Sequence, residues 1–255
     1  MKVNNNNTDE EHRDSFFDGL IERARKIRKE TEEEIPEEDY STWVEHYNIW
    51  IELSGPFMSS ISEFDKFNGL LFFRFVELMK HLFGLHFSVL SGNYHQSIRE
   101  LRYILESALQ AYYIDREHPE ATMRCKLEII KEIDKLIGGR LIDRTDLEHK
   151  KELKVLYSDL SKYVHSSYEE LRPTIEKGEG DYRVTLAFNK ELFYKCMVIT
   201  NRVMDIFYFM MLSLYPKIIP TIRENQLLLR SLTESKCILS VKFIEKHLDR
   251  GDKEK

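Results

Sequence analysis

Apolar residues recur every three or four positions along most of the chain, which is the spacing of one face of an α-helix. The pattern predicts helices over residues 15–34, 39–53, 57–90, 94–115, 119–137, 145–165, 189–214, 221–232 and 233–248. The seam of the helix over 94–115 consists of Ile98, Leu101, Leu105, Ala108 and Tyr112. The seam of the helix over 145–165 consists of Leu153, Leu156, Leu160 and Val164. We therefore expect an all-α fold.

Helix-breaking residues divide the chain into parts. Pro36 ends the first helix, Gly55-Pro56 predicts a turn, and Gly138-Gly139 closes the helix that precedes it. Residues 173–182 indicate an exposed loop, and 182–188 alternate well enough for a short extended stretch. We expect a disordered tail over 1–14, N-terminal helices over 15–56, a helical bundle over 57–215 and C-terminal helices over 216–255.

The composition fits a helical protein of the cytoplasm. Of the 255 residues only 10 are glycine and 6 are proline, which leaves little room for a turn-rich β fold or a glycine-rich phosphate loop. Cys125, Cys196 and Cys237 form no CxxC pair and fall beside apolar residues, so we expect buried, free thiols. The first residues are polar and acidic, unlike a secretory signal.

The longest apolar run, Val203–Tyr215, is shorter than the ~20 residues that span a membrane and contains Asp205. We expect it to be a buried helix and expect no membrane contact; the alternative is an interface in a helical homodimer. The net charge of -6 argues against attraction of nucleic acid over the whole surface. Cations gather at Arg23–Lys29, which indicates either a solvated helix face or a local nucleic-acid or partner contact.

Sequence-local motifs for cofactors and metals are missing. The chain has no GxGxxG, no GxxxxGK[ST], no HExxH and no glycine-flanked serine. The histidines are not spaced to place two ligands on one helix face. We therefore expect neither a cofactor nor a metal.

Two helices carry polar residues beside their apolar seams. Arg102 and Glu106 lie four residues apart on one helix, and Ser161 and His165 lie four apart on another, with Tyr157 one turn earlier. If the helices are neighbours, His165 is a candidate general acid or base, because histidine titrates near neutrality. Arg102, Glu106 and Ser161 complete the candidate catalytic set, in which Arg102 would hold a phosphate.

Arg99 and Tyr157 are candidate binding residues in the same region. The alternative to a catalytic site is a buried polar network that fixes how the two helices dock.

The run LSGNYHQSIRELRYILESALQAYYIDREHP (90–119), together with LKVLYSDLSKYVHSSYEEL (153–171), resembles the HEPN-like all-α superfamily. It looks closest to an uncharacterised branch with an Arg-x-x-x-Glu helix followed by a Ser-x-x-x-His helix. The resemblance implies a helical bundle, often dimeric, with N- and C-terminal helices added here. Many members are metal-independent endoribonucleases of defence systems.

Active members of that superfamily carry an arginine that is separated from the histidine by four to six intervening residues. Here those positions are Leu160, Asp159 and Ser158, so only His165 carries over from the nuclease motif. We therefore expect a module that binds RNA, a nucleotide or a protein in a defence or stress setting. The alternatives are a metal-independent endoribonuclease that uses His165 and a purely structural homodimer.

Overall fold

A computed structural model of the chain describes residues 6–62, 69–133, 139–163 and 187–251. Every regular element in these ranges is a helix, which confirms the all-α class. The helices are α1 (Asn6–Glu34), α2 (Glu37–Ser62), α3 (Leu70–Leu90), α4 (Tyr94–Glu117), α5 (Met123–Ile133), α6 (Gly139–Arg144), α7 (Lys150–Ser161), α9 (Lys190–Leu214), the 3-10 helix η2 (Pro216–Ile218), α10 (Ile219–Glu224), α11 (Gln226–Glu234) and α12 (Ile238–Gly251).

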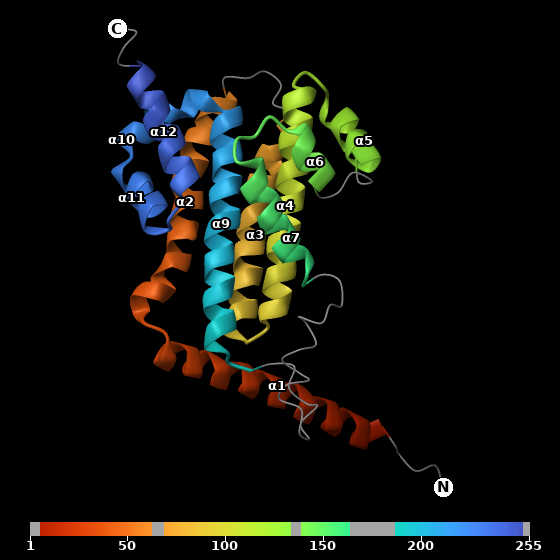
Figure 1. Cartoon of the computed structure of the whole chain (residues 1–255). Coiled ribbons are helices and arrows are strands. Elements are labelled where there is room, and N and C mark those ends of the chain that lie inside the picture. Colours follow the sequence, from red (N-terminus) through yellow and green to blue (C-terminus); the bar gives the residue numbers. More distant parts are fainter. Residues whose placement is uncertain (1–5, 63–68, 134–138, 164–186, 252–255) are drawn as a thin grey trace.

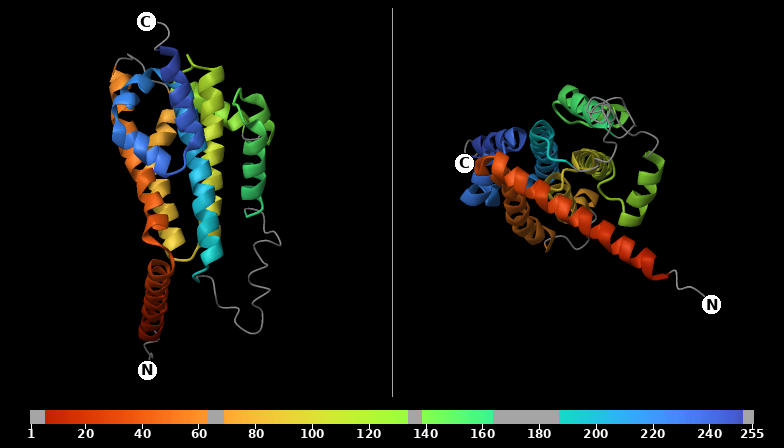
Figure 2. Two further views of the ribbon diagram at one scale, coloured as in Figure 1. Left: turned by 60° about the vertical axis from the view of Figure 1, so that its left-hand side comes forward. Right: turned by 90° about the horizontal axis from the view of Figure 1, so that it is seen from below.

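The long helices α2, α3, α4 and α9 form an upright bundle (Figure 1). Helices α5, α6 and α7 cover one flank beside α4, and α10, α11 and α12 cover the other flank against α2 and α9. Helix α1 crosses one end of the bundle and projects beyond it (Figure 2). The C-terminal helices are thus part of the packed structure.

The predicted seams fill the core. All five seam residues of α4 are buried, as are Leu153, Leu156 and Leu160 of α7. In the run Val203–Tyr215, residues 203–205 and 207–212 are buried, so it is a core helix and not a surface of this chain. Helix α9 is long and apolar enough to cross a membrane by length and composition alone, and 67% of its most apolar window is buried in the bundle.

The turn predicted at Gly55-Pro56 is wrong, because α2 continues through both residues to Ser62. Proline removes one backbone hydrogen bond from a helix. Directly after it, however, Phe57 is buried and its ring lies 5.4 Å from that of Phe75. This packing favours continuing the helix past the proline. The single helix predicted over 57–90 is consequently two helices, α2 and α3.

A carboxylate from another helix fixes where α3 begins. Asp115 of α4 accepts hydrogen bonds from the backbone nitrogens of Leu70 and Leu71 at 3.0 and 2.8 Å. The same carboxylate pairs with Lys126 of α5 at 2.7 Å, and the two side chains are only 6% and 2% exposed. Three helices therefore meet at one buried ion pair.

Asp205 of α9 caps the start of α12 as Asp115 caps the start of α3. It accepts from the backbone nitrogens of Leu239 and Ser240 at 2.8 and 2.9 Å, and from the Ser240 hydroxyl at 2.8 Å. Burial raises the pKa of Asp205, and these hydrogen bonds act in the opposite direction. The helix N-terminus is the natural partner of this carboxylate.

Several other predicted boundaries shift. Helix α1 begins at Asn6, within the segment 1–14 expected to be a disordered tail. The helix expected over 119–137 is described from Met123, and the one expected over 145–165 begins at Lys150 after the short α6. Asn189 caps α9, and its side chain accepts a hydrogen bond from the Leu192 backbone nitrogen at 3.0 Å. His165, the loop 173–182 and most of 182–188 lie outside the described residues.

The three cysteines do not share one environment. Cys196 and Cys237 are buried as expected, and burial raises the pKa of the Cys196 thiol to about 12. Cys125 is exposed, which contradicts the expectation that it is buried. It lies on α5, where the Thr122 hydroxyl contacts its sulfur at 3.2 Å.

His46 should make stability depend on pH. It is buried between α2 and α9, its Nε2 lies 2.9 Å from Asn201 Oδ1, and burial lowers its pKa from 6.5 to about 4. Between these values the unfolded chain binds the proton and the folded chain does not, so acid favours unfolding. We expect the free energy of unfolding to fall by about 3 kcal/mol from pH 7 to pH 4 through this group alone.

Urea denaturation of the wild type and of His46→Gln at several pH values measures this effect. As the pH falls, the free energy of unfolding should decrease more for the wild type than for the variant. Parallel pH profiles would contradict the prediction.

Candidate functional site

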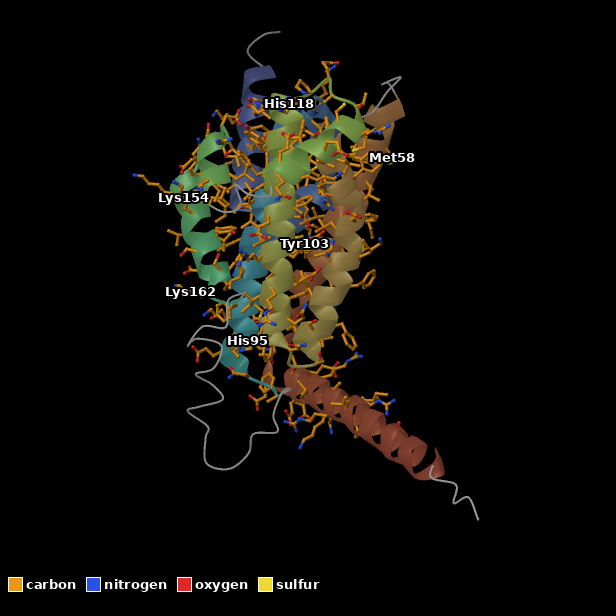
Figure 3. All side chains as sticks on the ribbon, turned by 90° about the vertical axis from the view of Figure 1, so that its right-hand side faces the viewer. Met58, His95, Tyr103, His118, Lys154 and Lys162 are labelled. Atoms are coloured by element: carbon orange, nitrogen blue, oxygen red, sulfur yellow. The ribbon has the colours of Figure 1, made fainter. Side chains whose placement is uncertain are left out.

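Arg102, Glu106 and Tyr157 come together where α7 packs on α4, and we call them the docking cluster. Figure 3 shows this side of the molecule, with α4 and α7 facing the viewer. Arg102 Nε donates to Glu106 Oε1 at 3.0 Å, and Arg102 Nη2 donates to the Tyr157 hydroxyl at 2.9 Å. The Tyr157 hydroxyl donates to Glu106 Oε1 at 2.5 Å. The polar residues of the two helices therefore contact one another as expected at Arg102, Glu106 and Tyr157.

The docking cluster is largely closed to solvent. The side chains of Arg102 and Glu106 are 11% and 23% exposed, and the guanidinium carbon lies 5.2 Å from the centre of the Tyr157 ring. Burial, followed by the hydrogen bond to Glu106, raises the pKa of Tyr157. Arg102 Nη1 is buried and has no hydrogen-bond partner among the described residues. The hydroxyl therefore serves as a neutral bridge between the two charges.

The other predicted residues lie nearby with different contacts. The Ser161 hydroxyl donates to the Tyr157 carbonyl at 2.7 Å within α7, so it does not join the docking cluster. Arg99 Nε donates to the Tyr163 carbonyl at 3.0 Å and ties the turn after α7 to α4. His165, the proposed acid or base, lies outside the described residues. The contacts of Arg99 and of the docking cluster join α7 to α4.

A groove runs along the other side of α7, between α7 and α9, and contains two cavities. The lower cavity, about 480 Å³, is lined by residues that include Leu156, Asp159, Lys162, Tyr163 and Lys195. The upper cavity, about 400 Å³, extends to α12. Val198 and Arg202 line both cavities, whereas Arg102 and Glu106 line neither.

The upper cavity combines an apolar wall with cations. The apolar lining residues are Leu147, Leu153, Val198, Ile206, Phe209, Ile238 and Leu239. Arg202, Lys236 and Lys242 supply positive charge from α9, the turn before α12, and α12. Within the described part of the chain none of these three cations forms an ion pair with a carboxylate. Such a lining suits a ligand that has both a flat apolar part and a negative charge.

Backbone strain is concentrated at the same cavity. Among the described residues, two that are not glycine have a positive φ, His149 at 65° and Lys236 at 56°. Both line the upper cavity, although they come from opposite sides of it. Left-handed backbone costs a side-chain-bearing residue about 1 kcal/mol or more, and such residues gather at functional sites.

The carboxylates of the upper cavity are already engaged. Asp205 caps α12, Glu148 lies 3.7 Å from Lys246, and Glu152 lies 3.9 Å from His149. In the described ranges no three His, Cys, Asp or Glu side chains are placed to hold a metal ion. The lining thus holds three carboxylates that have contacts of their own and three cations that have no carboxylate partner among the described residues.

The predicted basic stretch Arg23–Lys29 has a different character. Four of its cations pair with carboxylates of α1 itself: Arg25 with Glu22, Lys26 with Glu30, Arg28 with Glu32 and Lys29 with Glu33. These pairs weaken the positive field of the stretch. They favour the interpretation as a solvated helix face.

Sequence reasoning missed Arg202, Lys236 and Lys242 because they are brought together only by folding. The one local signal is Arg202, a cation within the otherwise mostly apolar run of residues 196–214. Arg102, Glu106, Tyr157 and Arg99 were predictable, since their spacing on each helix sets a common face.

Replacing Arg102 by alanine should strongly destabilise the fold, because it leaves the Glu106 carboxylate half-paired at a buried contact. We expect a loss of about 1.5 to 3 kcal/mol in the free energy of unfolding, which is the range for hydrogen bonds to charged groups. Arg230→Ala is the matched control: Arg230 pairs with Glu234 at the same spacing, but its side chain is 72% exposed. That change should cost about 0.5 kcal/mol.

Chemical denaturation of both variants measures the two losses. Equal losses would show that burial adds nothing to the Arg102 pair, and that the docking cluster does not hold α7 in place.

Comparisons with known proteins give no guide to this site. Models of known protein families, curated proteins and solved structures yield no significant match to the chain. The resemblance to the HEPN-like superfamily stays a prediction.

Proposed function

We propose that this chain is a binding module for RNA or a nucleotide, and that the groove between α7 and α9 is its binding site. The observation that carries the proposal is the upper cavity, where three cations without a carboxylate partner among the described residues surround an apolar wall. Nucleotides present the matching chemistry, a flat base and a charged phosphate. We place this function in the cytoplasm, in a defence or stress setting, as the HEPN-like resemblance implies.

The dimensions of the upper cavity support this class of ligand. Its volume of about 400 Å³ falls within the range of small-molecule sites. The base would lie against Ile206, Phe209 and Leu239, and the phosphate would approach Arg202 and Lys242. Arginine suits this role because its planar guanidinium can donate two parallel hydrogen bonds to phosphate.

The groove also offers room for more than one nucleotide. Arg202 lines both cavities, and the lower cavity adds Lys162 and Lys195. Lys195 contacts the Tyr163 hydroxyl, and its ammonium lies 4.8 Å from the centre of that ring. A strand of RNA laid along the groove would meet positive charge at both ends.

A metal-independent endoribonuclease that uses His165 is the second candidate. Arg99 favours it, because its guanidinium contacts the Tyr163 carbonyl, two positions before His165 in the sequence. An arginine from another helix could therefore supply the charge that the nuclease motif lacks beside its histidine. His165 would transfer the proton and Arg99 would stabilise the charge that develops on phosphate.

Charge reversal in the groove tests the binding proposal. Arg202→Glu and Lys242→Glu should each weaken binding of a fluorescent single-stranded RNA at least tenfold and lower the slope of log affinity against log salt by about 1. Fluorescence anisotropy at several salt concentrations measures both quantities. The control is Lys131→Glu on α5, which makes the same charge change away from the groove. If all three variants weaken RNA binding equally, the effect comes from the net charge of the protein, and the groove is not the binding site.

Lys236→Gly separates function from stability in the same experiment. Glycine accepts the left-handed backbone at this turn without strain, so the variant should be as stable as the wild type or gain up to about 1 kcal/mol. The loss of the lysine should still weaken RNA binding. A variant that is at least as stable and binds as tightly as the wild type would remove Lys236 from the site.

The nuclease candidate has its own test. His165→Ala should lower the rate of RNA cleavage, measured in the presence of a chelator, by about 10² to 10⁴-fold. His118→Ala, which changes an exposed histidine after the end of α4, is the matched control and should leave the rate unchanged. Cleavage that survives equally in both variants would eliminate this mechanism.

A further inference from the structure

The outer surface of α2 and α3 exposes several large apolar side chains to solvent. All three exposed phenylalanines among the described residues, Phe73, Phe83 and Phe87, lie on α3, and the last two are 61% and 73% exposed. Val76 is exposed between them, and Val44, Ile51 and Met58 are exposed on α2. We call these seven residues the aromatic face.

The two helices present one continuous face. The Tyr47 ring of α2 lies 5.2 Å from the Phe83 ring of α3, and its hydroxyl donates to the Leu82 carbonyl at 3.1 Å. Large apolar patches of this kind on soluble proteins mark interaction sites. None of these seven residues lines either cavity of the groove between α7 and α9, so the aromatic face is separate from that groove.

The spacing on each helix is that of a helix-packing seam. Residues 73, 76, 80, 83 and 87 alternate steps of three and four, and residues 44, 51 and 58 are seven apart. A heptad repeat of apolar positions is what a partner helix packs against. Four of the five α3 positions are apolar, and the fifth is Lys80.

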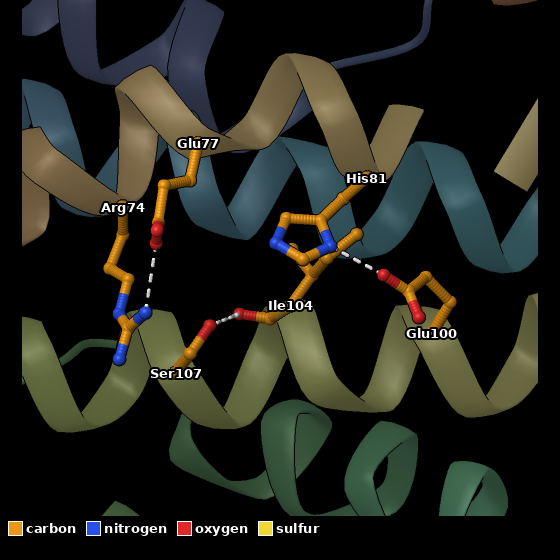
Figure 4. A network of polar contacts seen from close by, with 6 residues as sticks. All are labelled: Arg74, Glu77, His81, Glu100, Ile104 and Ser107. Carbon is orange, nitrogen blue, oxygen red and sulfur yellow. Dashed lines mark hydrogen bonds and ion pairs between the residues drawn. The ribbon is translucent and has the colours of Figure 1, made fainter. Parts of the chain in front are cut away.

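Polar pairs border this seam on the side of α4 (Figure 4). Arg74 pairs with Glu77 at 2.9 Å, and His81 contacts Glu100 of α4. Along α2, the positions between the apolar residues include the uncharged Asn48, Ser54 and Gly55 and the acids Glu45 and Glu52. An apolar centre with a polar rim is the anatomy of a protein interface. A membrane surface would instead favour a rim rich in lysine and arginine, and this rim also contains acids.

We propose that a second copy of this chain covers the aromatic face, with α3 packed antiparallel on α3 of the partner about a two-fold axis. The seam is self-complementary in this orientation. Val76 lies opposite Phe87 of the partner subunit, and Lys80 lies opposite Phe83 of the partner subunit, so its aliphatic stem and ammonium cover an aromatic ring. The two Lys80 side chains are not opposed to each other.

The area available matches what a stable dimer needs. The exposed parts of the seven side chains amount to roughly 700 Å² per copy, close to the ~800 Å² per partner of a standard interface. A two-fold axis also allows one surface to serve both subunits, which is the commonest symmetry of homo-oligomers.

Sedimentation velocity of the full chain at micromolar concentration tests the proposal. The wild type should have twice the chain mass of 30.5 kDa, and Phe83→Glu with Phe87→Glu should have the mass of a single chain. The control is Val155→Glu, at a 57% exposed position of α7, which should stay dimeric. A wild type that stays at 30.5 kDa, or a double variant that stays dimeric, overturns the proposal.

Disulfide trapping tests the orientation. Two single variants, Val76→Cys and Phe87→Cys, are prepared with the exposed Cys125 replaced by serine. An antiparallel pair cross-links efficiently only when the two variants are mixed. Cross-linking of Val76→Cys alone to the same extent would overturn the antiparallel arrangement, and near-native circular dichroism confirms that the variants fold.

Discussion

A buried carboxylate holds the bundle in register. Asp115 is almost completely removed from water, so its charge must be met inside the protein or cost several kcal/mol. It is met by two backbone nitrogens at the start of α3 and by Lys126 of α5. Because these partners belong to different helices, satisfying one charge fixes the start of α3 and the position of α5 against α4. The apolar seams then pack around a frame that is already aligned.

Asp205 applies the same principle at the other flank, and it connects the frame with the proposed binding site. By capping α12 it sets the first turn of that helix against α9. The residues placed by this contact include Ile238, Leu239 and Lys242, which line the upper cavity, and Lys236 stands in the turn just before. The cavity thus depends on a carboxylate whose hydrogen bonds go to the N-terminus of α12. Arg202, Lys236 and Lys242 line the same cavity and have no carboxylate partner within the described ranges.

Periodicity was sufficient for the fold class and for the seams, because both depend only on which residues repeat along a helix. It was insufficient where a residue far away in the sequence determines where a helix begins or ends. Gly55-Pro56 reads locally as a turn, but the burial of Phe57 carries α2 through it, and α3 starts where Asp115 supplies a cap from 45 residues away. The site residues likewise fall into those that the sequence predicts and those that it does not. Arg102 and Glu106 follow from i, i+4 spacing, whereas Arg202, Lys236 and Lys242 meet only after three segments have packed.

The arginine–glutamate spacing that resembles HEPN-like proteins does not by itself distinguish a reaction centre from a structural contact. The same spacing occurs in Arg28–Glu32 and Arg230–Glu234, where both side chains are well exposed and the pairs contribute little. Burial and the bridging hydroxyl of Tyr157 make the Arg102 pair different, and both act on how α7 sits on α4. Since the opposite side of α7 forms one wall of the groove, a contact that fixes this helix also fixes the distance between the α7 and α9 walls. The docking cluster therefore acts on the proposed binding site through the position of α7, because Arg102 and Glu106 line neither cavity.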